Sequence, residues 1–362
     1  MAVSTRTLLV TGGAGFIGSN FCRLVLEQRK GWKVINYDAL TYAGNLENLR
    51  DVEKNPNYSF VHGDIRNREA VEHALNKFKC DTIVHFAAES HVDRSIMDSG
   101  PFVSTNVLGT QVMLDSARHY WNSSKPANGA RFVHIGTDEV YGQLPLDRPN
   151  LKFTETTPLQ PSSPYSASKT ASDLLALAYN HTFGMDVVVT RCSNNFGPYQ
   201  YPEKVVPLFV TNLLDGKKVP LYGDGKNVRD WLHVIDHCEA ILTVLEKGKP
   251  GESYIIAGPP HTFLEIMDLA AQISGVPAPK QHPPPGLLNG LAAVMGVIGA
   301  VVPLPPAYSG EMLRSIAGVT YLATNAKARR ELGYDPRPLA DGLAETLAAE
   351  MAALGMPSPQ LA

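Results

Sequence analysis

The sequence has few of the features that mark secreted or nucleic-acid-binding proteins. It contains only four cysteines in 362 residues, at positions 22, 80, 192 and 238, and none forms a CxxC pair or a short-spaced framework. Reduced thiols in a cytoplasmic protein are the simplest account of that pattern. The formal net charge is −3, and no Lys/Arg cluster favours a nucleic-acid partner. The first residues run straight into a predicted strand, without the organisation of a signal peptide.

A hydrophobic run long enough to cross a membrane is also missing. The apolar segment Leu287–Val302 has 16 residues and is interrupted by Asn289, whereas a membrane helix needs ~20. A buried helix or a lid over a substrate cleft is the favoured interpretation, and a lobe that contacts a membrane is the alternative. The chain is long enough for two domains or for one large domain with an added lobe.

Alternating strands and helices are what the chain does contain. Apolar runs that predict buried strands occupy residues 7–10, 32–37, 58–61, 81–86, 131–135 and 185–190. Helical patterns lie between them, among them residues 19–29 and 67–78. Such repetition is typical of a parallel sheet with helices on both faces. We therefore predict an α/β fold: a Rossmann-type doubly wound parallel sheet with a smaller C-terminal substrate-binding α/β lobe.

The first predicted strand ends in a glycine-rich loop. Gly12, Gly15 and Gly18 precede the first helix, and glycines there let the backbone turn tightly and approach a pyrophosphate at the helix N-terminus. The second strand ends at Asp38, 20 residues after Gly18, where a carboxylate can accept hydrogen bonds from a ribose. A glycine pattern alone is weak evidence, but this strand–glycine–helix context with an acid favours NAD over NADP.

Polar residues with catalytic potential follow the fifth predicted strand. Thr137, Asp138 and Glu139 lie at its end, where open α/β sheets bind ligands. Two adjacent carboxylates can act as acid and base if their environments separate their pKa values; otherwise they are solvated turn residues. Tyr165 and Lys169 are four apart and share one helix face. A Lys ammonium beside the Tyr is expected to lower the phenol pKa from about 10.

Together these motifs resemble the extended short-chain dehydrogenases/reductases and, among them, the dTDP-glucose 4,6-dehydratases. The resemblance covers roughly residues 5–258. The segments that carry it are Thr11–Gly18, Tyr37–Leu46, Phe86–Arg94, Thr137–Glu139, Tyr165–Lys169, Arg191–Pro198, Pro202–Lys204, Leu221–Gly225 and Val228–Val234. The Asp–Glu pair distinguishes this branch from relatives that epimerise or decarboxylate nucleotide sugars.

The resemblance implies a reaction and a role for each catalytic residue. NAD⁺ would take hydride from C4 of a nucleoside-diphosphate-glucose, with dTDP-glucose favoured, while Tyr165 takes the hydroxyl proton. Lys169 would tune the Tyr, and Thr137 would position the C4 oxygen. Glu139 would then remove the C5 proton, and Asp138 would protonate the departing C6 hydroxyl. Return of the hydride to C6 would give the 4-keto-6-deoxy sugar.

The resemblance also implies two sets of binding residues. The cofactor contacts would be Gly12, Gly15, Phe16, Ile17, Gly18, Asp38, Asp64, Ile65, Ala87, Ala88, Tyr165 and Lys169. The substrate contacts would be Ser90, Thr137, Asn194, Lys204, Tyr222 and Arg229. Among the latter, Lys204 and Arg229 suit a diphosphate.

The sequence also bears on a metal site and on a dimer. His233 and His237 have the spacing of a metal pair on a helix, but no third ligand is evident, so an amphipathic helix at 235–246 and no metal are favoured. The family is usually dimeric through two helices of each subunit. The resemblance places these helices at Pro101–Tyr120 and Tyr165–Phe183, which implies a homodimer.

After residue 258 the resemblance weakens. Pro259-Pro260-His261 stands where the family has an Asn-rich turn, and residues 281–310 contain no charged side chain. Arg314 is the one candidate to replace a later phosphate-binding segment. Residues 324–334 and 339–354 predict two helices and are more similar to dihydroflavonol-reductase-like or sugar-epimerase-like relatives. A composite chain with a junction near 258 is therefore a hypothesis.

These observations define a domain division and three functions. Residues 1–192, with about 228–258, would form the NAD-binding domain, and residues 193–227 and 259–362 the substrate-binding lobe. Dehydration of a nucleoside-diphosphate-glucose is the leading function. The alternatives are a nucleotide-sugar epimerase or reductase of the same superfamily, and a weakly active NAD-binding chimera.

Overall fold

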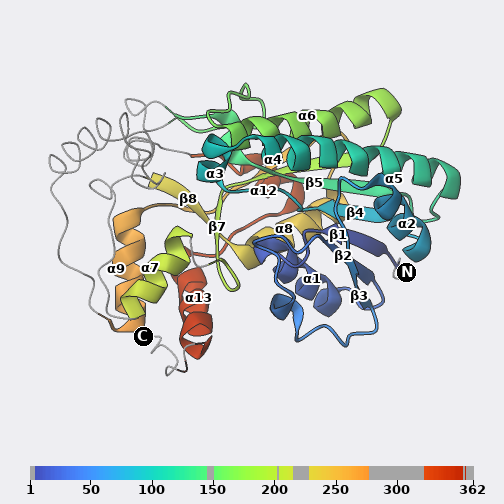
Figure 1. The fold of residues 1–362 in the computed structure, drawn as a ribbon. Coiled ribbons are helices and arrows are strands. Elements are labelled where there is room, and N and C mark those ends of the chain that lie inside the picture. Colours follow the sequence, from blue (N-terminus) through green and yellow to red (C-terminus); the bar gives the residue numbers. More distant parts are fainter. Residues whose placement is uncertain are drawn as a thin grey trace.

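A parallel sheet of seven strands forms the centre of the molecule in the computed structural model (Figure 1). The structure describes residues 5–144, 151–201, 204–214, 228–276, 322–353 and 355. The strand order is β3-β2-β1-β4-β5-β6-β9, so the chain starts near the middle and builds outward in both directions. The strands are β1 (Thr7–Thr11), β2 (Lys33–Asp38), β3 (Tyr58–His62), β4 (Thr82–His85), β5 (Arg131–Thr137), β6 (Val187–Cys192) and β9 (Ser253–Ile256).

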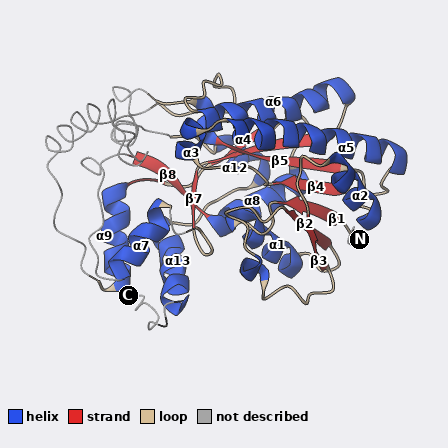
Figure 2. Cartoon of the chain, viewed as in Figure 1, coloured by secondary structure: helices blue, strands red, loops and turns tan. Residues whose placement is uncertain are grey.

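Helices cover both faces of this sheet (Figure 2). One face packs against α1 (Phe16–Gln28), α8 (Val234–Lys247) and α12 (Ala326–Leu332). The other packs against α2 (Arg68–Phe78), α5 (Thr110–Ser124) and α6 (Pro164–Phe183). Shorter elements are the 3-10 helices η1 (Leu46–Leu49) and η3 (Asp138–Tyr141), the helices α3 (Val92–Met97) and α4 (Gly100–Phe102), and the π-helical segment η2 (Val103–Gly109).

Strand β1 shows why the sheet is covered on both sides. Leu8 and Val10 belong to the apolar cluster under α1 and α8, whereas Leu9 belongs to the cluster under α2, α5 and α6. All three side chains are fully buried. Because successive strand residues point to opposite faces, a continuous apolar run gives two cores.

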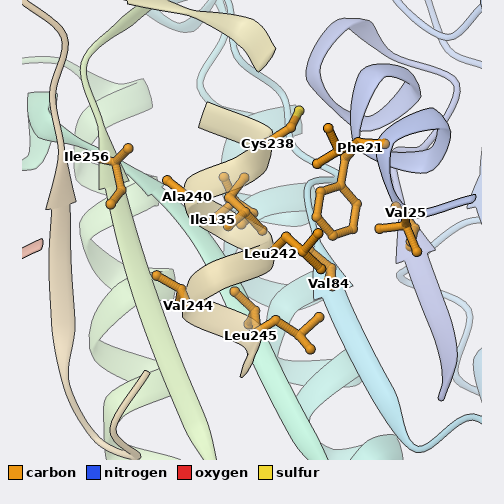
Figure 3. Close-up of a cluster of buried hydrophobic side chains, with 14 of the residues drawn as sticks. Phe21, Val25, Val84, Ile135, Cys238, Ala240, Leu242, Val244, Leu245 and Ile256 are labelled. Carbon is orange, nitrogen blue, oxygen red and sulfur yellow. The ribbon is translucent and has the colours of Figure 1, made fainter. Parts of the chain in front are cut away.

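Helix α8 completes one of these cores although it comes late in the chain. Figure 3 shows its Leu242 beside Phe21 of α1 and Val84 of β4, and Leu245 and Val25 belong to the same apolar cluster. All five side chains are buried. Full burial of one such side chain is worth roughly 1.5–3 kcal/mol, so α8 is an integral part of the sheet domain.

A smaller assembly adjoins the sheet. Strands β7 (Asn194–Phe196), β8 (Val228–His233) and β10 (Pro260–Thr262) form a second sheet in the order β10-β8-β7, with β10 antiparallel to β8. Three helices share an apolar cluster with Phe196 and Trp231 of that sheet. They are α7 (Val205–Leu214), α9 (Phe263–Ser274) and α13 (Leu339–Ala353), and they lie together at one end of the molecule (Figure 1).

The structure confirms the predicted fold class and shifts several boundaries. The helix predicted at 19–29 begins at Phe16, because the glycine loop leads directly into it, and the strand predicted at 185–190 is β6, Val187–Cys192. Both C-terminal helices exist, as α12 and α13. Residues 281–310, which include Leu287–Val302, and Arg314 lie outside the described residues. None of the helices within the described ranges has both the length and the apolar character needed to cross a membrane. The two-domain boundaries stay a prediction.

Candidate functional site

A cleft of about 580 Å³ opens at the carboxyl ends of the central strands. Its wall takes residues from the ends of β1, β2, β4, β5 and β6 and from the first turns of α1 and α6. Strands β1 and β4 lie side by side there, and the chain leaves them toward opposite edges of the sheet. Open α/β sheets bind their ligands at such a switch point.

Every predicted cofactor residue lines this cleft. The set is Gly12, Gly15, Phe16, Ile17, Gly18, Asp38, Asp64, Ile65, Ala87, Ala88, Tyr165 and Lys169. The predicted substrate residues in its wall are Ser90, Thr137, Asn194 and Lys204. Arg229, Asp138 and Glu139 are not part of the wall but lie close enough for their charges to act on one another. Tyr222 lies outside the described residues.

The glycine loop has a shape that larger residues would not allow. Gly12 has φ +70°, and a Cβ there would lie 2.7 Å from the backbone nitrogen of Ala87. A Cβ at Gly18 would collide with the carbonyl oxygen of Gly12. A Cβ at Gly15 would have more space: among the described atoms its single neighbour within 4 Å would be the carbonyl oxygen of Gly12, at 3.3 Å. This open side lies at the start of α1, whose first turn has no acidic residue, so the loop fits a phosphate group.

Asp38 is held at the edge of the cleft by two backbone amides. The Ala14 amide donates to Oδ2 at 2.9 Å, and the Leu40 amide donates to Oδ1 at 2.8 Å. The side chain is buried and lines the cleft. Each carboxylate oxygen keeps a further lone pair, so Asp38 can accept from ribose hydroxyls, and its charge disfavours a 2′-phosphate.

Tyr165 and Lys169 lie in the first turns of α6. Ser163 and Ser166 cap this helix reciprocally: the Ser166 amide donates to Ser163 Oγ at 3.0 Å, and the Ser163 amide donates to Ser166 Oγ at 2.9 Å. The side chains of Tyr165 and Lys169 are both buried in the cleft wall. Lys169 Nζ donates to the carbonyl oxygen of Ile135 at 2.7 Å.

The expected lowering of the Tyr165 pKa is wrong for this structure. Burial, and after it the charge of Glu139, raise the Tyr165 pKa well above its ordinary value, although a hydrogen bond with Thr137 opposes the rise. The Lys169 ammonium is engaged by the Ile135 carbonyl, and burial lowers the pKa of Lys169. Helical spacing places two residues on one face but does not fix where the ammonium points, which explains the error.

Asp138 and Glu139 occupy the turn η3 at the end of β5. Thr137 Oγ1 accepts a hydrogen bond from the Glu139 amide at 3.3 Å and so caps the turn. Asp138 is buried, and its Oδ2 has no hydrogen-bond partner in the described part of the chain. Burial and then the charge of Glu139 raise the Asp138 pKa well above its ordinary value.

Glu139 lies in a different environment although it is the next residue. Burial raises its pKa too, but the charges of Arg229 and Lys204 act in the opposite direction. Arg229 also opposes the rise of the Asp138 pKa, but Asp230 adds a second negative charge there beside that of Glu139. The pair therefore combines a carboxyl whose pKa lies well above its ordinary value with a carboxyl whose rise two cations oppose.

Some residues of the site carry no signal that sequence inspection could use. Asn106 of η2 donates to the Glu89 carbonyl at 3.0 Å and to Ser168 Oγ at 2.9 Å, and it accepts from the Glu89 amide at 2.8 Å. It thereby ties the loop after β4 to helix α6. Tyr42 and Tyr201 also line the cleft, and neither is among the predicted site residues. Tyr42 could have been found, because it lies in segment 37–46, which carries the resemblance.

The two histidines with metal-pair spacing are packing residues. His233 is the last residue of β8 rather than a helical residue, and His237 of α8 lies 2.9 Å, through Nδ1, from Asn195 Oδ1. Burial lowers the pKa of each to about 3, so both are neutral near pH 7. Over the described ranges, no group of three or more His, Cys, Asp or Glu residues could hold a metal ion.

Comparison with known proteins assigns the family. A family model described as GDP-mannose 4,6 dehydratase matches residues 9–346. The chain belongs to this family. Within the family it is similar to a dTDP-glucose 4,6-dehydratase from an Actinoplanes species, with 45% identity over 349 residues, 94% of this chain and 96% of that relative. A protein of the same name from Xanthomonas campestris pv. campestris is 54% identical over 255 residues, 70% of this chain and 71% of the relative.

Solved structures of the family agree with this fold. A dTDP-glucose 4,6-dehydratase from Bacillus anthracis, in complex with NAD, is 42% identical with a TM-score of 0.78, covering 96% of this chain and 97% of that one. A UDP-glucose 4-epimerase from Thermus thermophilus, also with NAD, is 28% identical with a TM-score of 0.77, covering 96% and 99%. The predicted resemblance is confirmed. The family match also continues past residue 258, and a composite origin stays a hypothesis.

Proposed function

We propose that this protein is an NAD-dependent dehydratase that converts a nucleoside-diphosphate-glucose, with dTDP-glucose favoured, to its 4-keto-6-deoxy sugar. The observation that carries the proposal is the contrast between the two carboxyls at the end of β5, because elimination of water needs one acid and one base. Burial and the charges of Glu139 and Asp230 raise the pKa of Asp138 well above its ordinary value, whereas the charges of Arg229 and Lys204 favour the charged form of Glu139. Relatives named dTDP-glucose 4,6-dehydratase, at 45% and 46% identity over 94% of this chain, support the assignment.

NAD fits the half of the cleft nearest β1 and β2. The open side of Gly15 and the start of α1 would hold the pyrophosphate, and Asp38 would hold the ribose. Ala87 and Ala88 leave room along the wall after β4. When bound, NAD⁺ supplies an acceptor for the sugar hydride and later returns it.

Tyr165 and Lys169 would act on the C4 hydroxyl. Tyr165 would take its proton, while Thr137, the hydrogen-bond partner of the phenol, would hold the C4 oxygen. Because burial raises the Tyr165 pKa, the transfer needs a positive charge at the phenol. Lys169, one turn along the same face of α6, would provide that charge.

Elimination would follow at the next pair of carbons. Glu139 would remove the proton from C5, which the neighbouring C4 ketone makes acidic. Asp138 would give its proton to the C6 hydroxyl, which leaves as water. The electron pair of the C5–H bond becomes the C5–C6 double bond, and the returning hydride at C6 with a proton at C5 completes the product.

Substrate binding would use the opposite side of the cleft. Ser90, Asn194 and Lys204 line the wall there, and Arg229 lies close enough to Glu139 for its charge to act on that carboxyl. Lys204 and Arg229 would pair with the diphosphate. Tyr222 completes the proposed set.

A nucleotide-sugar epimerase or reductase is the alternative function. It is favoured by the similarity of the whole fold to a UDP-glucose 4-epimerase, at a TM-score of 0.77. An epimerase would move hydride without losing water, so no leaving hydroxyl would be present to receive the proton of Asp138. A weakly active NAD-binding chimera is the remaining alternative.

One incubation distinguishes these functions. The purified protein is mixed with dTDP-glucose, and separately with UDP-glucose, in deuterated water, and the product is followed by NMR. We expect a 4-keto-6-deoxy product that carries solvent deuterium at C5. An epimer formed without loss of water would contradict the dehydratase assignment, and bound NAD without any turnover would favour the chimera.

We also infer a homodimer, built on η2, α5 and α6. Helices α5 and α6 lie side by side along one edge of the molecule, and both contact η2 (Figure 1). Large apolar side chains on these elements are half exposed: Val103 55%, Leu108 51%, Leu174 52% and Phe183 50%. Apolar groups gathered in this way favour a protein partner, and a second copy fits the dimers that the family usually forms.

A cytoplasmic location and the two-domain division belong to the same proposal, and the four buried free cysteines support the location.

Leu174→Lys is expected to convert the dimer to a monomer, because it places a charge in the middle of the proposed interface. Light scattering coupled to size exclusion measures the mass. Leu46→Lys is the matched control, since Leu46 is 41% exposed but lies on η1, away from α5 and α6. A Leu174→Lys protein with the mass of the wild type would exclude this interface.

A further inference from the structure

Helix α6 carries a carboxylate near the face of Tyr165 and Lys169. Asp173 lies one turn beyond Lys169 and is fully buried. Arg191 of β6, also buried, donates from Nε to Asp173 Oδ2 at 2.9 Å. The Nε2 atom of His134 lies 3.2 Å from the other carboxylate oxygen. A buried pair of this kind fixes geometry, because separating it would leave a charge without compensation.

Arg191 connects this carboxylate to the turn that carries the acid and the base. Its Nη1 donates to the hydroxyl of Tyr141 at 2.8 Å. Tyr141 is the last residue of η3, the turn that begins with Asp138. The Tyr141 ring is buried and stacks on Phe153, with 5.2 Å between ring centroids. The turn is therefore anchored at its far end by a side chain with a single orientation.

The near end of the same turn is held by α6 directly. A Cβ at Gly136 would lie 2.7 Å from Asp173 Oδ1 and 2.7 Å from the Thr190 carbonyl oxygen. The Asp173 carboxylate is thus packed against the backbone just before the turn. Lys169 Nζ binds the carbonyl oxygen of Ile135, one residue earlier, at 2.7 Å. Helix α6 thus contacts the chain directly before the catalytic turn, and Arg191 links its Asp173 to the end of that turn.

We propose that Asp173, Arg191 and Tyr141 form a buried clamp that positions Asp138 and Glu139 for the elimination step. The inference rests on the dehydratase function proposed above. None of the three residues belongs to the described wall of the cleft, so they act as positioning residues. Tyr165 lies on α6 itself, so releasing the Tyr141 hydroxyl frees the turn without moving the Tyr. Misplacement of a catalytic group by about 1 Å can cost on the order of 100-fold.

Tyr141→Phe tests the clamp, because it removes one hydroxyl and keeps the stacked ring. We expect elimination, followed as C5 deuterium exchange and loss of water, to slow by roughly 10- to 100-fold. Reduction of bound NAD⁺ by the sugar in a single turnover should keep its wild-type rate, and KM should not change. A purely structural role would lower thermal stability and slow both steps alike. If Tyr141→Phe left both rates unchanged, or slowed both by the same factor relative to the wild type, the clamp would be overturned.

Two further proteins make the result decisive. Tyr254→Phe is the control, since Tyr254 is also fully buried and its hydroxyl accepts from the Lys249 amide at 3.2 Å, outside the cleft. It should leave both steps unchanged. Asp173→Asn leaves the Arg191 guanidinium buried without its carboxylate and is expected to destabilise the fold, so Tyr141→Phe is the variant that decides. A wild type that eliminates no water overturns both proposals, whereas a wild type that eliminates water no faster than Tyr141→Phe overturns the clamp alone.

Discussion

Glu139→Gln is expected to slow elimination by roughly 10²- to 10⁴-fold, the usual contribution of a positioned general base. The amide has nearly the shape of the carboxylate but cannot take the C5 proton. Tyr165, Lys169 and Thr137 are unchanged, so the sugar should still reduce the bound NAD⁺. We therefore expect reduced cofactor to accumulate on the protein, visible by its absorbance, while NMR detects no deuterium at C5.

To interpret Glu139→Gln, cofactor reduction and elimination must be measured separately. Glu246→Gln is a suitable control, because Glu246 pairs with Arg29 on the surface of α8 and lies outside the cleft. That change should affect neither step. If Glu139→Gln abolished cofactor reduction together with C5 exchange, Glu139 would not be the base, and its charge would serve to bind the substrate.

Tyr165→Phe is expected to block the reaction one step earlier, again by roughly 10²- to 10⁴-fold. Without the phenol, the C4 hydroxyl loses the proton acceptor that we propose beside Thr137. Neither reduced cofactor nor deuterated sugar should appear in a single turnover. Because Tyr165 is buried and burial raises its pKa, a Phe fits the same site without a charge to solvate. The variant should therefore fold as well as the wild type and retain NAD through gel filtration.

The comparison with Tyr254→Phe separates chemistry from packing. Both changes remove a hydroxyl from a buried ring, but Tyr254 does not line the cleft. A Tyr165→Phe protein that still reduced its cofactor at the wild-type rate would assign the base to another group. Taken together, the Tyr165 and Glu139 variants should stop the reaction on either side of the reduced-cofactor state.

Much of the fold and of the cofactor site can be read from short stretches of sequence. The glycine loop and Asp38 are recognisable because a strand, a tight turn and a helix N-terminus are neighbours in the chain. Likewise, polar residues after an apolar run, such as Thr137 and Glu139, are predicted to meet at one edge of the sheet. These inferences need no knowledge of packing, which is why the whole predicted cofactor set lines one cleft.

What the sequence could not supply are the contacts between distant segments. Asp173, Arg191 and Tyr141 come from a helix, a strand and a turn, and no spacing rule joins them. The direction of the Lys169 ammonium depends on the Ile135 carbonyl, 34 positions away, so the predicted effect on Tyr165 is wrong. The separation of the Asp138 and Glu139 pKa values depends on Arg229, Lys204 and Asp230, which reach the pair through tertiary structure.

The late position of α8 and β9 has a consequence for how the chain folds as it is synthesised. Strand β9 completes the sheet beside β6, and α8 fills the core beneath α1. A nascent chain of only the first 192 residues has a sheet with one apolar face covered by α1 alone and with the β6 edge unpaired. Such surfaces bind chaperones or other nascent chains. We expect the NAD-binding domain to become protease-resistant only after residue 256 has left the ribosomal exit tunnel, although all of its predicted NAD-contacting residues emerge much earlier.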